Sequence, residues 1–93
     1  MSGKDSELVF RNLNLTLEQF ENCLNNICVD NNIFIEEKES KNNGKEIHYK
    51  VFKNLIRVYV TKKGLTIDCS ICRDENLRQI ISNELKKYLI MLI

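Results

Sequence analysis

The spacing of apolar residues changes along the chain, and each spacing predicts a different element. Residues 8–13 form a short apolar run suited to a strand, with an irregular lead-in to a helix as the alternative. Thr16 and Gln19 have the spacing of a capping box, which marks a helix start. Helical spacing of the next apolar residues predicts a helix from Leu17 to about Val29. Its apolar face comprises Leu17, Phe20, Cys23, Leu24, Ile27 and Cys28.

Between Ile33 and Ser70 the apolar residues alternate with polar ones, which is the period of a half-buried strand. Breaks rich in Asn, Lys and Gly at 41–44, 53–54 and 62–64 have the character of turns. These connections are too short for crossover helices, so the strands must pair as an antiparallel meander. The predicted strands are Ile33–Glu39, Glu46–Phe52, Leu55–Thr61 and Leu65–Ser70.

A second apolar stripe at helical spacing follows Asp74, which can cap the helix. With few helices available, both most simply pack on one face of a twisted antiparallel sheet. We therefore expect one α+β domain over residues 1–93, a curved sheet of four to five strands in the order β-α-β-β-β-β-α, with 1–7 as a flexible N-terminus. The stripe comprises Leu77, Ile80, Ile81, Leu85, Tyr88, Leu89 and Leu92.

Alternation along the predicted strands assigns their side chains to two faces of the sheet. The more apolar set should lie under the helices and comprises Ile47, Tyr49, Val51, Ile56, Val58, Val60, Leu65, Ile67 and Cys69. The other set mixes cations with aromatic residues and lies on the face that no helix covers. It comprises His48, Lys50, Phe52, Leu55, Arg57, Tyr59, Thr61, Thr66, Asp68 and Ser70.

This open face supports two functional interpretations. Large aromatic residues and Arg carry most contact energy in protein interfaces, which favours a protein contact centred on Phe52, Tyr59, Arg57 and Leu55. Alternatively, Phe52 and Tyr59 stack on the bases of single-stranded nucleic acid while Lys50, Arg57 and His48 meet its phosphates. Ordinary amphipathic strands give similar mixtures, so plain solvation is the third interpretation.

The last six residues, Tyr-Leu-Ile-Met-Leu-Ile, are more apolar than a free helix end. A helical stripe covers only part of this run, so Ile90, Met91 or Ile93 should be exposed unless another surface covers them. Candidate covers are the sheet, a dimer partner or a further domain of a longer chain. The run is too short to span a membrane.

Composition narrows the classes of function. Fourteen basic and thirteen acidic residues give a net charge of +1, which excludes a long-range field that attracts polyanions. The polar N-terminus has no secretion signal, so we expect a cytoplasmic protein.

Four cysteines raise the question of a metal or redox site. Cys69 and Cys72 form a CxxC pair, but a thioredoxin-like role needs the first cysteine at a helix N-terminus after a βαβ unit. Cys23 and Cys28 lie on a helix without the turn that lets two zinc ligands converge. We interpret all four as small buried thiols and expect no metal and no cofactor.

The chain contains a single histidine, His48. Catalysis by a Ser/His or Cys/His pair needs a nucleophile beside the imidazole, and strand alternation instead gives neighbours such as Arg57 and Tyr59. We therefore predict no catalytic residue and no enzyme.

Three short segments resemble a known domain family. They are Arg11-Asn-Leu-Asn-Leu15, Val58-Tyr-Val-Thr-Lys-Lys-Gly-Leu-Thr-Ile67 and Asn76-Leu-Arg-Gln-Ile-Ile-Ser-Asn-Glu-Leu85. With the element order, they resemble one half of the TATA-binding-protein (TBP) fold, and more closely the N-terminal TBP-like domain of the RNase LS toxin family. The resemblance spans most of residues 8–90 and implies an accessory domain of a toxin or phage-defence protein, without catalytic residues.

The sequence thus favours a non-catalytic interaction or regulatory module that contacts a protein partner or itself. Single-stranded nucleic-acid binding through the open face is the alternative, and a small inhibitor protein of phage or plasmid origin fits the size equally well.

Overall fold

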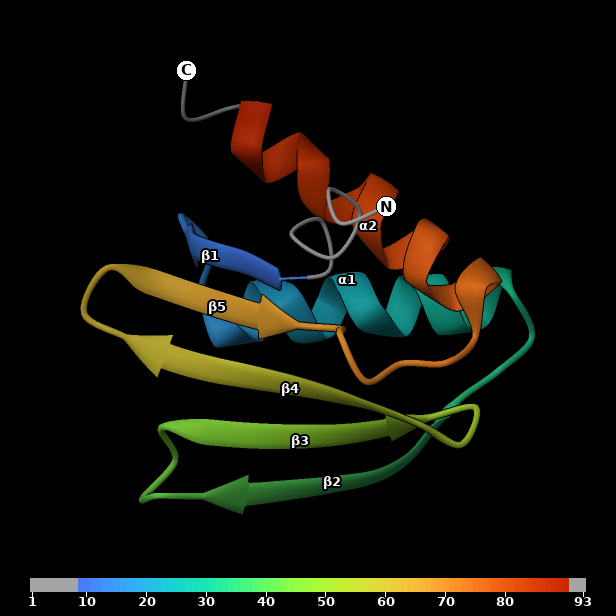
Figure 1. Cartoon of the computed structure of the whole chain (residues 1–93), viewed down its shortest axis with the longest axis horizontal. Helices are drawn as coiled ribbons and strands as arrows, with labels where there is room; N and C mark the ends of the chain where they lie inside the picture. The colour runs from blue at the N-terminus through green and yellow to red at the C-terminus, as the bar shows by residue number, and fades with distance from the viewer. Residues whose placement is uncertain (1–8, 91–93) are drawn as a thin grey trace.

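The elements follow one another in the predicted order (Figure 1). The computed structural model describes residues 9–90, with side chains up to Lys87. The elements are β1 (Val9–Leu13), α1 (Leu17–Asp30), β2 (Ile35–Lys41), β3 (Glu46–Val51), β4 (Asn54–Thr61), β5 (Gly64–Asp68) and α2 (Glu75–Ile90).

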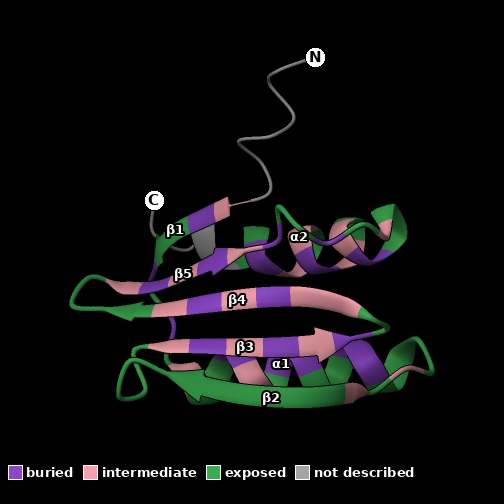
Figure 2. Cartoon of the chain, turned by 60° about the horizontal axis from the view of Figure 1, so that its bottom comes forward, coloured by how far each residue is buried: buried purple, intermediate pink, exposed green. Residues whose placement is uncertain are grey.

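Five strands form one antiparallel sheet in the order β1-β5-β4-β3-β2. The strands β2 to β5 make the predicted meander because their short connections allow only antiparallel pairing. The strand β1 joins the far edge beside β5. Both helices lie on one face of this sheet, and the opposite face is open (Figures 1 and 2). The predicted α+β architecture is confirmed.

Local chemistry sets both ends of α1. The Thr16 hydroxyl accepts a hydrogen bond from the Gln19 amide at 3.1 Å, and the Gln19 side chain accepts one from the Thr16 amide at 2.9 Å. After Asp30, Asn32 takes a φ of 58°, and the Ile33 amide donates back to the Cys28 carbonyl at 2.9 Å. This turn delays entry into the sheet, so β2 spans Ile35–Lys41 and the predicted range Ile33–Glu39 was wrong by two residues.

The end of β3 differs from the prediction, and Phe52 was wrongly placed on the open face. Because Val51 pairs with Asn54, Phe52 and Lys53 form a two-residue hairpin loop between β3 and β4. Their φ angles are 51° and 64°, so the strand alternation stops before Phe52.

The valine Val60 was also misplaced, since we expected it under the helices and it is 36% exposed. Its amide donates to the carbonyl of Lys45 at 2.8 Å. Val60 is therefore flanked by Lys45 of the β2–β3 turn. The other inward residues of β4, Ile56 and Val58, lie opposite the buried residues Tyr49 and Ile47 of β3.

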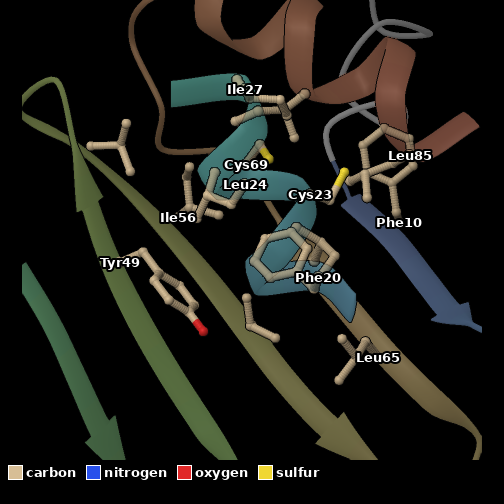
Figure 3. Packing of buried hydrophobic residues seen from close by; sticks show 14 of the residues in the cluster. Phe10, Phe20, Cys23, Leu24, Ile27, Tyr49, Ile56, Leu65, Cys69 and Leu85 are labelled. Atoms are coloured by element: carbon tan, nitrogen blue, oxygen red, sulfur yellow. The ribbon is translucent and has the colours of Figure 1, made fainter. Parts of the chain in front are cut away.

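A single apolar layer fills the space between the helices and the sheet (Figure 3). Full burial of a large apolar side chain contributes about 1.5–3 kcal/mol, so this layer is the main source of stability. The sheet contributes Ile47, Tyr49, Val51, Ile56, Val58, Leu65 and Ile67, Cys69 follows directly after β5, and all eight are buried as predicted. The helices contribute Phe20, Leu24, Ile27, Leu77, Ile81 and Leu85.

The side chain of Tyr49 is 0% exposed, and a hydrogen bond satisfies its buried hydroxyl. It donates to Oε2 of Glu21 at 2.7 Å, and its ring meets Phe20 edge-on with centroids 5.7 Å apart. From β2, Lys38 forms an ion pair with the same Glu21 oxygen and lies 6.0 Å from the Tyr49 ring centroid. Because Ile35 is the one residue of β2 that packs against the core, this network attaches the edge strand to α1.

The network predicts an acid-sensitive contribution to stability. Hydrogen bonds from Lys38 and Tyr49 hold the pKa of Glu21 below its usual value of 4.5, although burial opposes them. A carboxyl group with a lowered folded-state pKa stabilises the fold above its unfolded pKa, and this contribution is lost as pH falls through the folded pKa. Glu21→Gln should therefore lower the free energy of unfolding by about 1 kcal/mol at pH 7 and by much less at pH 3.

Urea unfolding of both proteins at the two pH values measures this difference. The exposed Glu18, one turn earlier in α1, offers the control Glu18→Gln. A Glu21→Gln effect that is equal at both pH values would contradict the assignment.

Candidate interaction surfaces

Strand pairing brings together most of the residues that the sequence assigned to the open face. His48 lies directly opposite Arg57, and Lys50 lies opposite Leu55. Tyr59 lies opposite Glu46. These side chains are half-buried, and Phe52 lies apart from them in the β3–β4 turn.

Carboxylates lie within hydrogen-bonding distance of Arg57 and His48 on this face. Arg57 Nη2 donates to Oδ2 of Asp68 at 3.0 Å, and Nε2 of His48 lies 2.6 Å from Oε2 of Glu46. The Glu46 side chain also accepts a hydrogen bond from Asn42 at 2.9 Å. One nitrogen of the Arg57 guanidinium and one of the His48 imidazole are therefore engaged, whereas the buried Nε of Arg57 has no hydrogen-bond partner among the described residues.

The carboxylate of Asp68 is held charged by its neighbours. Burial disfavours the charged form, but hydrogen bonds from the side chain and backbone of Ser70, together with Arg57, hold the pKa of Asp68 below its usual value. Ser70 donates through its hydroxyl at 2.6 Å and through its amide at 2.9 Å. Arg57 consequently faces a full negative charge at neutral pH.

Two further carboxylates lie opposite basic side chains of the open face. Glu39 lies opposite His48 and Glu37 lies opposite Lys50 in the β2–β3 pair. Sequence alternation within single strands did not reveal these neighbours, because register across the sheet decides them. The open face is thus a charge-balanced surface, in contrast to the cationic surface expected from His48, Lys50 and Arg57 alone.

A different apolar surface lies at one end of the sheet. Phe34 is 69% exposed and Phe52 is 54% exposed, and Ile33 and Ile80 beside them are half-buried. We call these four residues the aromatic end. They come from the α1–β2 connection, the β3–β4 turn and α2, which meet at the same end of the molecule (Figure 1).

Two shallow hollows share Ile33 and Phe52 as lining residues. One, of about 160 Å³, is also lined by Asn31, Asp74, Asn76, Leu77 and Ile80. The other, of about 270 Å³, is also lined by Asn32, Phe34, Glu36 and Lys53. Both are open to solvent, so the aromatic end offers two adjacent recesses for small apolar side chains.

The β3–β4 turn holds Phe52 in a costly conformation. A two-residue loop with positive φ at both positions is favoured by Asn-Gly, whereas other residues lose about 1–2 kcal/mol each in the left-handed region. The β2–β3 turn follows this preference, with Asn42 and Asn43 at φ of 53° and 57°. The β3–β4 turn instead carries Phe52 and Lys53 at equivalent angles. Local strain that stability does not explain is a common mark of a functional position.

The sequence contains one signal for the aromatic end, which an interpretation based on strand alternation misses. Ile33-Phe34-Ile35 is an uninterrupted apolar run after the Asn-Asn pair that follows α1, where alternation predicts a polar residue in the middle. The positive φ values of Phe52 and Lys53 carry no comparable sequence signal, because neither residue type favours that conformation.

All four cysteines are buried free thiols, as predicted. Burial, with smaller contributions from Cys72 and Asp68, raises the pKa of Cys69 to about 12. Burial also raises the pKa of Cys72 and of Cys28. A thiol must ionise to attack an electrophile or bind a metal, so these three groups are poorly suited to either task.

Within residues 9–90 no three His, Cys, Asp or Glu side chains converge as metal ligands do. No described helix is long and apolar enough to cross a membrane. The side chains of Ile90, Met91 and Ile93, for which we predicted an apolar contact, lie outside the described part of the chain.

Comparisons with protein-family models, curated proteins and solved structures found no match to this chain. The resemblance to a TBP-like domain therefore stays a prediction from short sequence segments.

The cysteine environment predicts slow thiol labelling. In native protein at pH 8, a disulfide reagent such as DTNB should modify the four thiols far more slowly than in urea, because a buried thiol reacts only after local opening. The rate should follow the stability of the fold when urea is added below the unfolding midpoint. Rapid modification of Cys69 or Cys72 in the native protein would instead indicate an accessible thiolate.

Proposed function

We propose that this protein is a non-catalytic interaction domain that binds another protein through the aromatic end. The observation that carries the proposal is the exposure of Phe52 from a strained turn, beside a second exposed aromatic residue. Large aromatic residues in recessed, apolar surroundings supply most of the binding energy in protein interfaces. Exposure of two such residues side by side costs solubility unless a partner covers them.

The shape of the aromatic end favours a short amphipathic segment as the partner. The Phe52 ring borders both hollows, so apolar side chains of one helix turn or one extended segment can occupy the two recesses together. Asp74 lines the smaller hollow, and Glu36 and Lys53 line the larger one. A partner segment with apolar anchors and a mixed polar rim is complementary to this arrangement.

The open face is the weaker candidate for the same function. Its Arg57 is paired with Asp68, and Tyr59 lies half-buried between Thr66 and Glu46 on the neighbouring strands. A protein that docked there would have to desolvate or break these pairs, which costs more than covering the aromatic end.

A double substitution separates binding from folding. In Phe52→Asn with Lys53→Gly, the turn receives the residues that its backbone favours, so the free energy of unfolding should rise by about 1 kcal/mol. Urea unfolding measures this gain. The matched control is Asn42→Ala with Asn43→Ala in the β2–β3 turn, which should destabilise because it removes two residues that tolerate positive φ and the hydrogen bond from Asn42 to Glu46.

The same variant tests the binding surface. Peptides selected from a random display library on the wild-type protein should carry two apolar anchors, and calorimetry should show their affinity for the Phe52→Asn, Lys53→Gly protein reduced at least about tenfold. Tyr59→Ala should bind these peptides as the wild type does. If the reverse holds, with Tyr59→Ala defective and the turn variant normal, the open face is the binding surface and our proposal is wrong.

Light scattering of the wild type and the turn variant distinguishes a foreign partner from a second copy. A dimer that becomes a monomer on substitution of Phe52 would identify the partner as another copy of this chain.

A further inference from the structure

Lysines gather at the end of the sheet opposite the aromatic end. Lys45 lies in the β2–β3 turn, and Lys62 and Lys63 form the β4–β5 turn. The hydrogen bond of 2.8 Å from the Val60 amide to the Lys45 carbonyl places the first turn beside the end of β4. Two hairpin turns therefore lie side by side, about two strand spacings or roughly 10 Å apart.

The charges of these turns are largely uncompensated. Among the described residues, no carboxylate forms an ion pair with Lys45, Lys62 or Lys63, and all three side chains are exposed. A fourth lysine, Lys41, stands at the start of the first turn with its ammonium 3.7 Å from Glu39. The nearest other carboxylate along the chain, that of Glu46, is hydrogen-bonded to His48 and Asn42.

The composition of these turns indicates the class of ligand. Lysine is depleted from protein interfaces, which need aromatic or aliphatic anchors, and of the large exposed apolar residues only Val60 lies at this end of the described chain. Phosphate groups, in contrast, are bound by flexible ammonium groups and need no apolar anchor. Neither turn carries an aromatic side chain, so the turns themselves offer no platform for base stacking.

We propose that Lys41, Lys45, Lys62 and Lys63 form a second binding site, for the phosphate backbone of a nucleic acid, on the two hairpin turns. This site is independent of the partner surface at the aromatic end. It reads no bases, and it differs from the stacking interaction that the open face suggested from sequence. Because the net charge of the whole chain is +1, the attraction is local and orients the molecule with these turns toward the polyanion.

Fluorescence anisotropy with labelled nucleic acid tests the site. The probes are a mixed-sequence DNA duplex and a single-stranded RNA of the same length, each of about 20 nucleotides per strand, at low salt. Three to four phosphate contacts predict that the logarithm of the association constant for the duplex falls with the logarithm of salt concentration with a slope of about −3. Replacing Lys45, Lys62 and Lys63 with Gln should weaken binding at least about tenfold and reduce the slope to about −1.

A charge-matched variant separates a site from net charge. Arg73→Gln, Lys86→Gln and Lys87→Gln remove the same charge from exposed positions outside the two turns and should leave affinity close to that of the wild type. An equal loss in both triple variants, or no binding to either probe at low salt, would overturn the proposal. Binding to the RNA alone would also overturn it, because backbone contacts do not distinguish the strands in this way.

Amide chemical shifts locate the contact. Gly44 lies in the first turn and Gly64 directly follows the second, and their amide resonances should move on addition of the duplex. The amide resonances of Phe34 and Phe52 at the aromatic end should stay in place. Shifts confined to Arg57, Tyr59 and His48 would assign the nucleic acid to the open face and refute the turn site.

Discussion

The contact between the Tyr49 hydroxyl and Glu21 is the constraint on which the outer half of the sheet depends. It satisfies a polar group in the middle of the apolar layer, and it joins α1 to β3. Lys38 extends the contact to β2, an edge strand whose residues are otherwise mostly exposed (Figure 2). The position of β2 in turn fixes Phe34 beside Phe52. A polar network of three side chains thereby positions an apolar surface that lies outside the core.

One-sided helix cover produces two very different kinds of accessible surface. The broad open face carries cross-strand pairs such as Arg57 with Asp68, which balance much of its charge. The two ends of the sheet are unbalanced in opposite ways. One end exposes Phe34 and Phe52, and the other exposes Lys45, Lys62 and Lys63. Successive turns of a meander lie at alternate ends of the sheet. The β3–β4 turn with Phe52 therefore lies at one end, and the β2–β3 and β4–β5 turns with the lysines lie at the other.

Turn chemistry also separates structural from functional positions. Asn42 and Asn43 occupy left-handed conformations that their side chains tolerate, and Gly64 has a φ of 129° with the Leu13 carbonyl oxygen only 2.1 Å from where a Cβ would lie. These residues suit the fold. Phe52 and Lys53 adopt comparable angles without such a preference, so their side chains are better explained by what they contact than by the backbone they occupy.

Periodicity in the sequence determined the elements, their order and the inner face, because burial of one face imposes a spacing on each helix and strand. It placed Tyr49, Phe20 and Ile81 in the core correctly. Tertiary structure alone decided which charges face each other, since only the register of β2 places Glu37 opposite Lys50 and Glu39 opposite His48. It also decided that Phe52 lies in the β3–β4 turn, away from the open face, and lines one hollow together with Phe34. Such neighbours lie far apart in sequence, and no local pattern encodes the backbone turns that bring them together.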